Sequence, residues 1–230
     1  MPQKNKESWT VVERQPIKIF NRRYRLIKRI IDLMLCFLVL PFFIPLAFVI
    51  IVIIRLDSTG PAMFVQERVG KGGRVFRIYK FRTLAHKLDD SFHRSFMKNF
   101  VQGQVEHGEG GNTVFKPFTK TQVTRVGKIL RTTSLDEMPQ IINVLRGEMS
   151  FVGPRPNVLW EVEEYHDWHK ERLEVLPGIT GLAQVRGRSG IFFDEIVYWD
   201  IEYIRHQSLL LDLKILWWTV ASMLLGKGGA

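Results

Sequence analysis

The sequence predicts a mainly helical α+β protein, with one re-entrant helix hairpin in a membrane, a small β-hairpin and amphipathic interfacial helices around a cytoplasmic domain. Three observations lead to this fold class. Residues 30–54 form a long apolar run, residues 61–83 hold two strand-like runs around a glycine-rich turn, and the second half of the chain repeats apolar residues at helical spacing. With 230 residues, 46% of them hydrophobic, the chain is long and apolar enough to fold.

The apolar run at residues 30–54 carries one charge, Asp32, and is long enough to span a hydrocarbon core of about 30 Å. It is too long for a cleaved signal peptide, and no small-residue cleavage site follows it. A straight transmembrane helix is the simplest interpretation. Pro41 and Pro45, however, lie one turn apart near the middle of the run, where each removes a helix hydrogen bond and favours a kink.

The charges beside the run favour a helix that enters and leaves the membrane on one face. Five basic residues precede it and, by the positive-inside rule, hold the N-terminus in the cytoplasm: Arg22, Arg23, Arg25, Lys28 and Arg29. A straight helix would then export a basic domain without disulfides, which is unusual cargo for an oxidising compartment. We therefore expect a re-entrant membrane helix over residues 30–55, with an exported domain as the alternative.

The flanking segments fit a protein that lies on a membrane. Residues 1–29 form a basic amphipathic segment that would attract anionic phospholipid. Residues 208–225 are apolar but interrupted by Asp212 and Lys214, and the Trp217–Trp218 pair is typical of a membrane interface. An ordinary core helix explains this last segment equally well, so both interpretations stay open.

The charge balance predicts an anionic partner. The chain has 33 Lys and Arg residues against 23 Asp and Glu, a formal net charge of +10. Nucleic acid, an acidic membrane leaflet and a phosphorylated substrate all fit this balance. The only cysteine, Cys36, lies in the apolar run, which excludes a disulfide framework and a cysteine metal site and fits a reducing compartment.

Residues 56–230 are expected to form the cytoplasmic, membrane-associated domain. The glycines between residues 70 and 73 favour a β-hairpin turn over a phosphate-binding loop, because the GK[ST] ending is missing. Residues 85–121 lose clear periodicity and are expected to form a loop or insertion. Helices are expected at residues 124–133, 136–147 and 157–176, and a loop from residue 177. His166 and His169 share the third helix, but no third metal ligand accompanies them.

The most informative stretch is Arg131–Pro156, which combines two adjacent carboxylates with two arginines. The Ser134–Glu137 pattern matches a helix capping box, which is a purely structural explanation. The chemical alternative is that Asp136, ionised at a helix start, attacks phosphorus while Glu137 holds Mg²⁺. Arg131 and Arg155 would then bind phosphate oxygens. Capping and catalysis need not exclude each other.

At these motifs the chain resembles the monotopic phosphoglycosyl transferases of the bacterial sugar transferase family, the small type with little beyond the catalytic domain. The SLDE and GPRP motifs are the most specific part of the likeness. The resemblance covers most of the chain and is carried by four stretches: RIYKFRT at 77–83, GKILRTTSLDEMPQIINVLRGEMSFVGPRP at 127–156, LPGITGLAQVRGR at 176–188 and LLLDLKILWWTV at 209–220.

The resemblance implies transfer of a sugar 1-phosphate from a nucleoside diphosphate sugar, usually a UDP-sugar, to a polyprenyl phosphate such as undecaprenyl phosphate, with release of UMP. It further implies a ping-pong mechanism through a phosphosugar ester on Asp136, with Mg²⁺ near Glu137 and Asp136. Arg131 and Arg155 match phosphate-contacting positions. Four further residues match motif positions with less defined roles in substrate binding: Lys80, Arg82, Asp200 and Asp212.

The same resemblance implies a re-entrant helix whose kink proline is Pro45, although Ile44 stands where the family often has a serine. It predicts that the protein lies in the bacterial inner membrane with its catalytic domain on the cytoplasmic face, and that it begins the assembly of an exopolysaccharide or another glycan. The expected partners are then membrane lipid and a nucleotide sugar, not nucleic acid, and a homo-oligomer remains open. A basic membrane-anchored binding module is the competing hypothesis. It leaves Asp136 and Glu137 unexplained, because acidic pairs repel anionic ligands.

Overall fold

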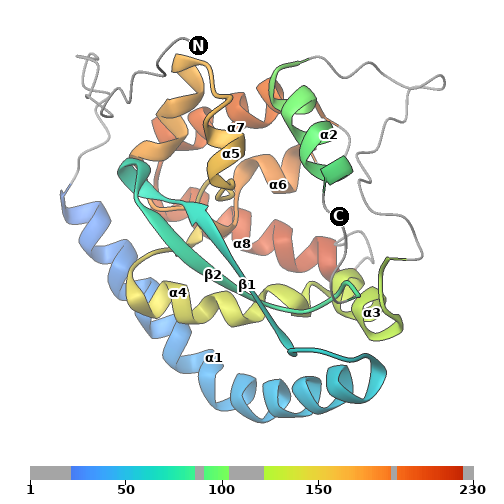
Figure 1. The fold of residues 1–230 in the computed structure, drawn as a ribbon. Coiled ribbons are helices and arrows are strands. Elements are labelled where there is room, and N and C mark those ends of the chain that lie inside the picture. The colour runs from blue at the N-terminus through green and yellow to red at the C-terminus, as the bar shows by residue number, and fades with distance from the viewer. Residues whose placement is uncertain (1–21, 86–90, 104–121, 188–190, 225–230) are drawn as a thin grey trace.

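The computed structural model describes residues 22–85, 91–103, 122–187 and 191–224. In these ranges the chain is mainly helical, with two small two-stranded sheets (Figure 1). The expected mainly helical α+β class is thereby confirmed. Most of the predicted N-terminal segment and much of the predicted insertion lie outside the described residues.

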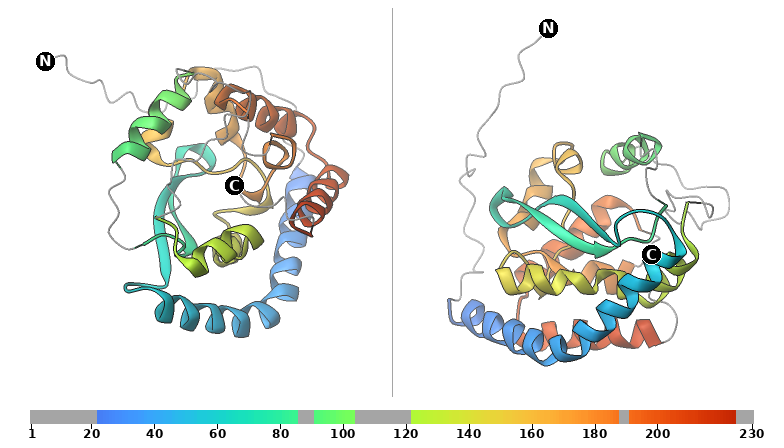
Figure 2. Two further views of the ribbon diagram at one scale, coloured as in Figure 1. Left: turned by 90° about the vertical axis from the view of Figure 1, so that its right-hand side faces the viewer. Right: turned by 60° about the horizontal axis from the view of Figure 1, so that its bottom comes forward.

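The apolar run forms one long helix, α1 (Arg22–Asp57), which contains both Pro41 and Pro45. Its axis turns through a large angle about midway along its length (Figure 2). The helix begins at Arg22, so residues 22–29 are its first two turns rather than part of a separate segment.

Much of the apolar side-chain surface of α1 is open. Phe42 is 74% exposed, Phe48 is 70% exposed and Leu56 is 83% exposed. By length and composition α1 is long and apolar enough to cross a membrane. Large exposed apolar surfaces mark interaction or membrane sites, and together with its length and composition this exposure indicates that α1 associates with a membrane.

The predicted β-hairpin is confirmed. Strand β1 (Met63–Val69) pairs antiparallel with β2 (Val75–Phe81), and the register joins Met63 to Phe81 and Val69 to Val75. The turn η1 (Lys71–Gly73) needs glycine at position 72, where φ is 66°. The hairpin crosses the middle of the molecule, with α1 curving below it in Figure 1.

The helix expected at residues 124–133 is confirmed as α3 (Arg125–Thr133), capped by the Thr124 hydroxyl, which accepts from the Gly127 N–H at 2.9 Å. The next helix is less regular than expected. It begins as a 3₁₀ segment, η2 (Leu135–Gln140), continues as α4 (Ile141–Arg146) and stops at Gly147 with a φ of 76°, as predicted.

Two expectations about residues 157–187 are wrong. Residues 157–176 do not form one helix but two short pieces, α5 (Leu159–Val162) and η3 (Asp167–Glu174). The helix breaks because polar side chains make local bonds instead: the Glu161 carboxylate accepts from the Val158 N–H, and the His169 ring from the His166 N–H. The expected loop from residue 177 contains strand β4 (Gly178–Thr180) and helix α6 (Leu182–Gly187).

Strand β4 pairs parallel with β3 (Ser150–Val152). The backbone approaches closely where Gly153, just after β3, meets Gly178 of β4. A Cβ atom on Gly178 would lie 2.1 Å from the Gly153 nitrogen. Neither position has room for a side chain. Glycine at both positions therefore allows the loop that follows β3 to pack directly against β4.

Three further helices complete the described fold. Helix α2 (Ser91–Val101) lies within the predicted insertion, so this part of residues 85–121 is not a loop. Helix α7 (Phe193–Arg205) packs against α6, and α8 (Leu209–Leu224) packs against β3, β4 and α6. Helix α8 has features of both a core helix and an interfacial helix, the two interpretations left open by the sequence. Ile215 is fully buried, whereas Trp217 is 71% exposed.

Candidate active site

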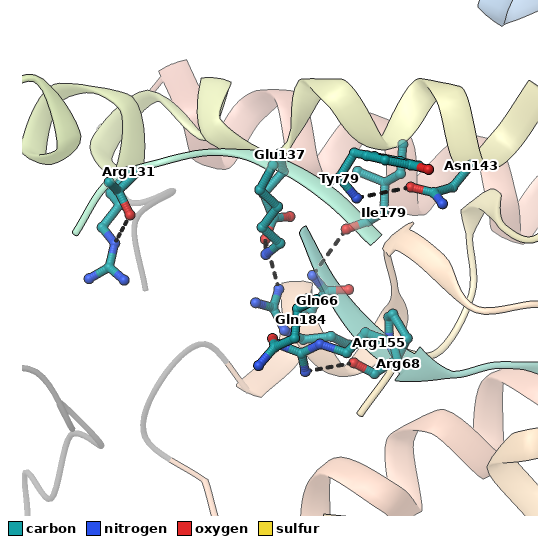
Figure 3. A network of polar contacts seen from close by, with 12 residues as sticks. Gln66, Arg68, Tyr79, Arg131, Glu137, Asn143, Arg155, Ile179 and Gln184 are labelled. Atoms are coloured by element: carbon teal, nitrogen blue, oxygen red, sulfur yellow. Dashed lines mark hydrogen bonds and ion pairs between the residues drawn. The ribbon is translucent and has the colours of Figure 1, made fainter. Parts of the chain in front are cut away.

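The site is built from β2, η2 and the loop that follows β3. Strand β2 carries Lys80, and Asn143 of α4 holds this strand in place. The fully buried Asn143 amide donates to the Arg77 carbonyl at 2.6 Å and accepts from the Tyr79 N–H at 3.3 Å (Figure 3). The position of Lys80 is therefore tied to the helix that follows the acidic pair.

The acidic pair lies in the first turn of η2. Ser134, with φ 56° and ψ 16°, ends α3 in the left-handed region and redirects the chain into the 3₁₀ segment. The predicted capping box is wrong, because the Ser134 side chain makes no cap hydrogen bond to η2. The Glu137 carboxylate also does not reach back to Ser134, since it is engaged by two cations.

These two cations meet at one oxygen of Glu137. Lys80 Nζ lies 2.6 Å from Glu137 Oε1, and Arg155 Nη1 lies 3.1 Å from the same atom. The Glu137 and Arg155 side chains point toward one another in Figure 3. Burial raises the pKa of Glu137, but the charges and hydrogen bonds of Lys80 and Arg155 outweigh it and lower the pKa to about 2. Glu137 is therefore ionised at any working pH.

Asp136 differs from its neighbour. Burial and the adjacent Glu137 carboxylate raise the pKa of Asp136 to about 6, although the charges of Lys80, Arg155 and Arg131 act in the opposite direction. Two adjacent carboxylates with separated pKa values have separate chemical roles. At neutral pH Asp136 is mostly an anion, only partly neutralised by nearby cations, and this suits a nucleophile.

Arg131 approaches the pair from α3. Its Nε donates to the Thr83 hydroxyl at 3.1 Å, which fixes the guanidinium near the end of β2 (Figure 3). Burial lowers the pKa of Arg131, while the charge of Asp136 raises it. The structure thus brings Asp136, Glu137, Arg131, Arg155 and Lys80 together, as five of the predicted site residues.

The other three predicted site residues lie in supporting positions. Arg82 donates to the Ser58 carbonyl at 2.8 Å, just beyond the end of α1. Asp200 on α7 is buried in an ion pair with Arg172. Asp212 on α8 is held by Tyr24 and Lys28 of α1, at 2.9 and 2.8 Å, and by Tyr203 of α7 at 2.7 Å.

Several residues that support the site were missed by the sequence analysis. Asn143 fixes β2, Arg68 donates to the Pro156 carbonyl at 3.1 Å, and Arg172 donates to the Arg155 carbonyl at 3.1 Å. Asn143 and Arg172 lie in segments predicted to be helical. Both are buried, but this is seen only in the folded structure. Local pattern alone did not single them out.

The expected Mg²⁺ site consists of two carboxylates, Asp136 and Glu137. Among the described residues, no group of three or more His, Cys, Asp or Glu side chains is placed to hold a metal ion. Mg²⁺ is commonly held by one or two carboxylates together with substrate phosphates, so Asp136 and Glu137 fit this metal only in the presence of a phosphorylated ligand. The ion pairs of Glu137 with Lys80 and Arg155 both use Oε1, so a metal bound by Glu137 would use Oε2.

The arrangement fits phosphate chemistry. Three cationic side chains surround an ionised glutamate and a partly neutralised aspartate, so their positive charge exceeds what the two carboxylates neutralise. A diphosphate would supply the missing negative charge, and guanidinium groups match its oxygens in geometry.

Comparison with known proteins agrees with this chemistry. The family model described as Bacterial sugar transferase matches residues 23–226. The galactosyl transferase CpsE of Streptococcus agalactiae serotype III is 42% identical over 200 residues, covering 86% of this chain and 41% of that protein.

Two further relatives carry more specific names. The UDP-N-acetylgalactosamine-undecaprenyl-phosphate N-acetylgalactosaminephosphotransferase of Aeromonas hydrophila is 37% identical over 211 residues, covering 89% of this chain and 45% of that protein. The UDP-glucose:undecaprenyl-phosphate glucose-1-phosphate transferase of Caulobacter vibrioides is 40% identical over 205 residues, covering 86% of this chain and 69% of that protein. The chain thus spans less than half the length of the streptococcal and Aeromonas relatives.

Proposed function

Because this chain belongs to the bacterial sugar transferase family, we propose that it transfers a sugar 1-phosphate from a UDP-sugar to undecaprenyl phosphate, giving undecaprenyl-diphosphate-sugar and UMP. The observation that carries the proposal is the pair at the start of η2. Asp136 has a pKa near neutrality, and Glu137 beside it is held ionised by Lys80 and Arg155.

In the first half-reaction the Asp136 carboxylate attacks the β-phosphorus of the donor. The bond from that phosphorus to the bridging oxygen breaks, UMP leaves with the electron pair, and the sugar phosphate becomes an acyl phosphate ester of Asp136. Arg155 and Arg131 stabilise the negative charge that develops on the phosphate oxygens, and Lys80 adds a third cation.

In the second half-reaction an oxygen of undecaprenyl phosphate attacks the same phosphorus. The bond between Asp136 and phosphorus breaks, which releases the lipid-linked product and restores the carboxylate. Mg²⁺, held by Glu137 and Asp136 with the donor diphosphate, would neutralise that diphosphate and ease departure of UMP. The Glu137 charge also keeps Lys80 and Arg155 fixed beside the reacting phosphorus.

We place the catalytic domain on the cytoplasmic face of the bacterial inner membrane, with α1 as a re-entrant helix. Both ends of α1 contact the same domain: Arg29 donates to the Leu145 carbonyl at 3.0 Å, and Asp57 accepts from the Val126 N–H at 3.3 Å. The bend near Pro41 and Pro45 allows this geometry, and a straight span would separate the two ends.

Cysteine labelling tests the topology. In a Cys36→Ala background, Arg22→Cys and Thr59→Cys place single thiols at the two ends of α1. We expect a membrane-impermeant maleimide to label both thiols from the cytoplasmic side only. Labelling from opposite sides would contradict the re-entrant helix and support an exported domain.

The raised pKa of Asp136 predicts a pH dependence for the first half-reaction. Asp136 must be ionised to attack, so single-turnover UMP release without lipid acceptor should rise as the pH increases through about 6 and then level off. Measuring without the acceptor removes the titration of the lipid phosphate from the profile. A flat profile between about pH 5 and 8 would contradict the role of Asp136.

The same pKa shift has the opposite effect on stability. The folded protein binds the Asp136 proton more tightly than the unfolded chain, whose carboxyl has an ordinary pKa of 3.8. The contribution of this group to the free energy of unfolding therefore declines as the pH rises from about 4 through about 6. The activity and the contribution of Asp136 to stability should therefore move in opposite directions in this window.

A screen of UDP-sugars with Mg²⁺ and undecaprenyl phosphate tests the proposed function and identifies the donor together. We expect UMP release with one donor or a few related donors. If full-length protein in a bilayer or detergent released no UMP with any donor, the proposal would be wrong, and a membrane-anchored binding module would be favoured instead.

A further inference from the structure

Arg172 of η3 is a buried arginine with an unusually complete set of partners. Its side chain is 2% exposed. Nη1 donates to Asn157 Oδ1 and to the Tyr165 hydroxyl, both at 2.9 Å, and Nη2 donates to Asp200 Oδ2 at 2.5 Å and to the Arg155 carbonyl at 3.1 Å. One side chain thus joins η3, α7 and the loop after β3.

That loop carries the phosphate-binding candidate Arg155. Its Pro154 carbonyl accepts from the Gly178 N–H at 2.9 Å, and its Asn157 carbonyl from the Val69 N–H at 2.8 Å. These bonds anchor the two ends of the loop. Between them, the backbone of Arg155 is anchored by Arg172, whose bond to the Arg155 carbonyl is the contact nearest to the reactive side chain.

The Arg155 side chain needs such an anchor. It is 47% exposed, so packing alone does not hold it, and it forms an ion pair with Glu137 at 3.1 Å. An incoming diphosphate would compete for the same guanidinium. A fixed backbone carbonyl limits how far the side chain can turn away when its partner changes.

The cost of burying Arg172 indicates a role other than stability. Its counter-ion Asp200 is 1% exposed, and burial raises the pKa of Asp200 to about 6 against the opposing charge of Arg172. Buried ion pairs are often no more stabilising than apolar residues of the same size. A network of this cost, placed directly behind Arg155, fits the positioning of a charged group.

We infer that Arg172, with Asp200 as its counter-ion, is a positioning residue that fixes Arg155 for binding the donor diphosphate and for the phosphoryl transfer. The inference rests on the proposed function. The four hydrogen bonds of Arg172 described above all go to protein atoms. Arg172 acts through the Arg155 backbone.

A double-mutant cycle tests this, with kcat/KM for the UDP-sugar and the dissociation constant for UDP as readouts. We expect Arg172→Lys to lower kcat/KM by about 10- to 100-fold and to weaken UDP binding. In an Arg155→Ala background the same change should cost about twofold or less, because the group it positions is gone.

His169→Gln is the matched control. His169 is also fully buried in η3, and its ring contacts the His166 N–H and Asp194 rather than the Arg155 loop. Its effect on kcat/KM should be the same with and without Arg155. If Arg172→Lys does not fold, Asp200→Asn takes its place, because it removes the counter-ion and leaves the other three bonds of Arg172 intact. We again expect a loss of kcat/KM that disappears in the Arg155→Ala background.

Equal losses from Arg172→Lys, or from Asp200→Asn in its place, in the presence and absence of Arg155 would overturn the inference and assign the network to stability alone. This outcome differs from failure of the proposed function, in which the unchanged protein itself releases no UMP.

Discussion

Replacing Asp136 with asparagine should abolish UMP release. The change keeps the shape of the side chain and removes the only nucleophilic oxygen in the proposed first half-reaction. Losses of three orders of magnitude or more in kcat are typical when an enzyme nucleophile is removed, about 4 kcal/mol in the activation barrier. The rate should be measured as UMP release with the donor identified by the screen.

The same variant should be at least as stable as the unchanged protein. Burial and Glu137 disfavour the ionised Asp136 carboxylate in the folded state, so a neutral amide removes an unfavourable interaction. The unfolding midpoint near pH 7.5 should therefore not fall. Asp167→Asn, an exposed carboxylate with an 83% exposed side chain, is the control and should change the rate by less than about twofold. Undiminished turnover of Asp136→Asn would exclude the covalent mechanism.

Replacing Glu137 with glutamine should lower kcat by about two to three orders of magnitude, the range seen when one charge-stabilising group is removed from a site. The reason is twofold: Lys80 and Arg155 lose the anion that holds them, and the proposed Mg²⁺ loses a carboxylate. UDP binding measured without Mg²⁺ should be unchanged or tighter, since both cations then become available to the diphosphate.

The Mg²⁺ dependence of this variant separates the two effects. If Glu137 holds the metal, the Mg²⁺ concentration for half-maximal residual activity should rise by at least about tenfold. Glu67→Gln serves as a control, because Glu67 lies on the adjacent strand with a 65% exposed side chain. An unchanged Mg²⁺ dependence in Glu137→Gln would remove Glu137 from the metal site.

Elements with strong local signals were predicted well. The apolar run, the glycine turn of the hairpin, the helix that begins at Arg125 and the Gly147 stop each depend on residues close together in the chain. The acidic pair and its arginines were predicted from motif residues, and the structure brings them together with Lys80. Local sequence was sufficient where local interactions decide the structure.

Long-range polar contacts were not predictable in the same way. Residues 157–176 have helical periodicity, yet Arg172 bonds to Asp200, 28 positions away, and the segment forms two short pieces instead of one helix. Ser134 matches a capping box, but its Glu137 partner is taken by Lys80, 57 positions earlier. Only the assembled fold brings these partners together, so no local pattern could have indicated them.

Mass spectrometry of the intact protein tests the central claim most directly. The protein is incubated with the UDP-sugar and Mg²⁺ but without lipid acceptor, quenched and weighed. We expect a covalent adduct with the mass of one sugar phosphate, located on Asp136 by fragmentation, absent in Asp136→Asn and removed by adding undecaprenyl phosphate. UMP release and product formation by a protein that never carries this adduct on Asp136 would contradict the account.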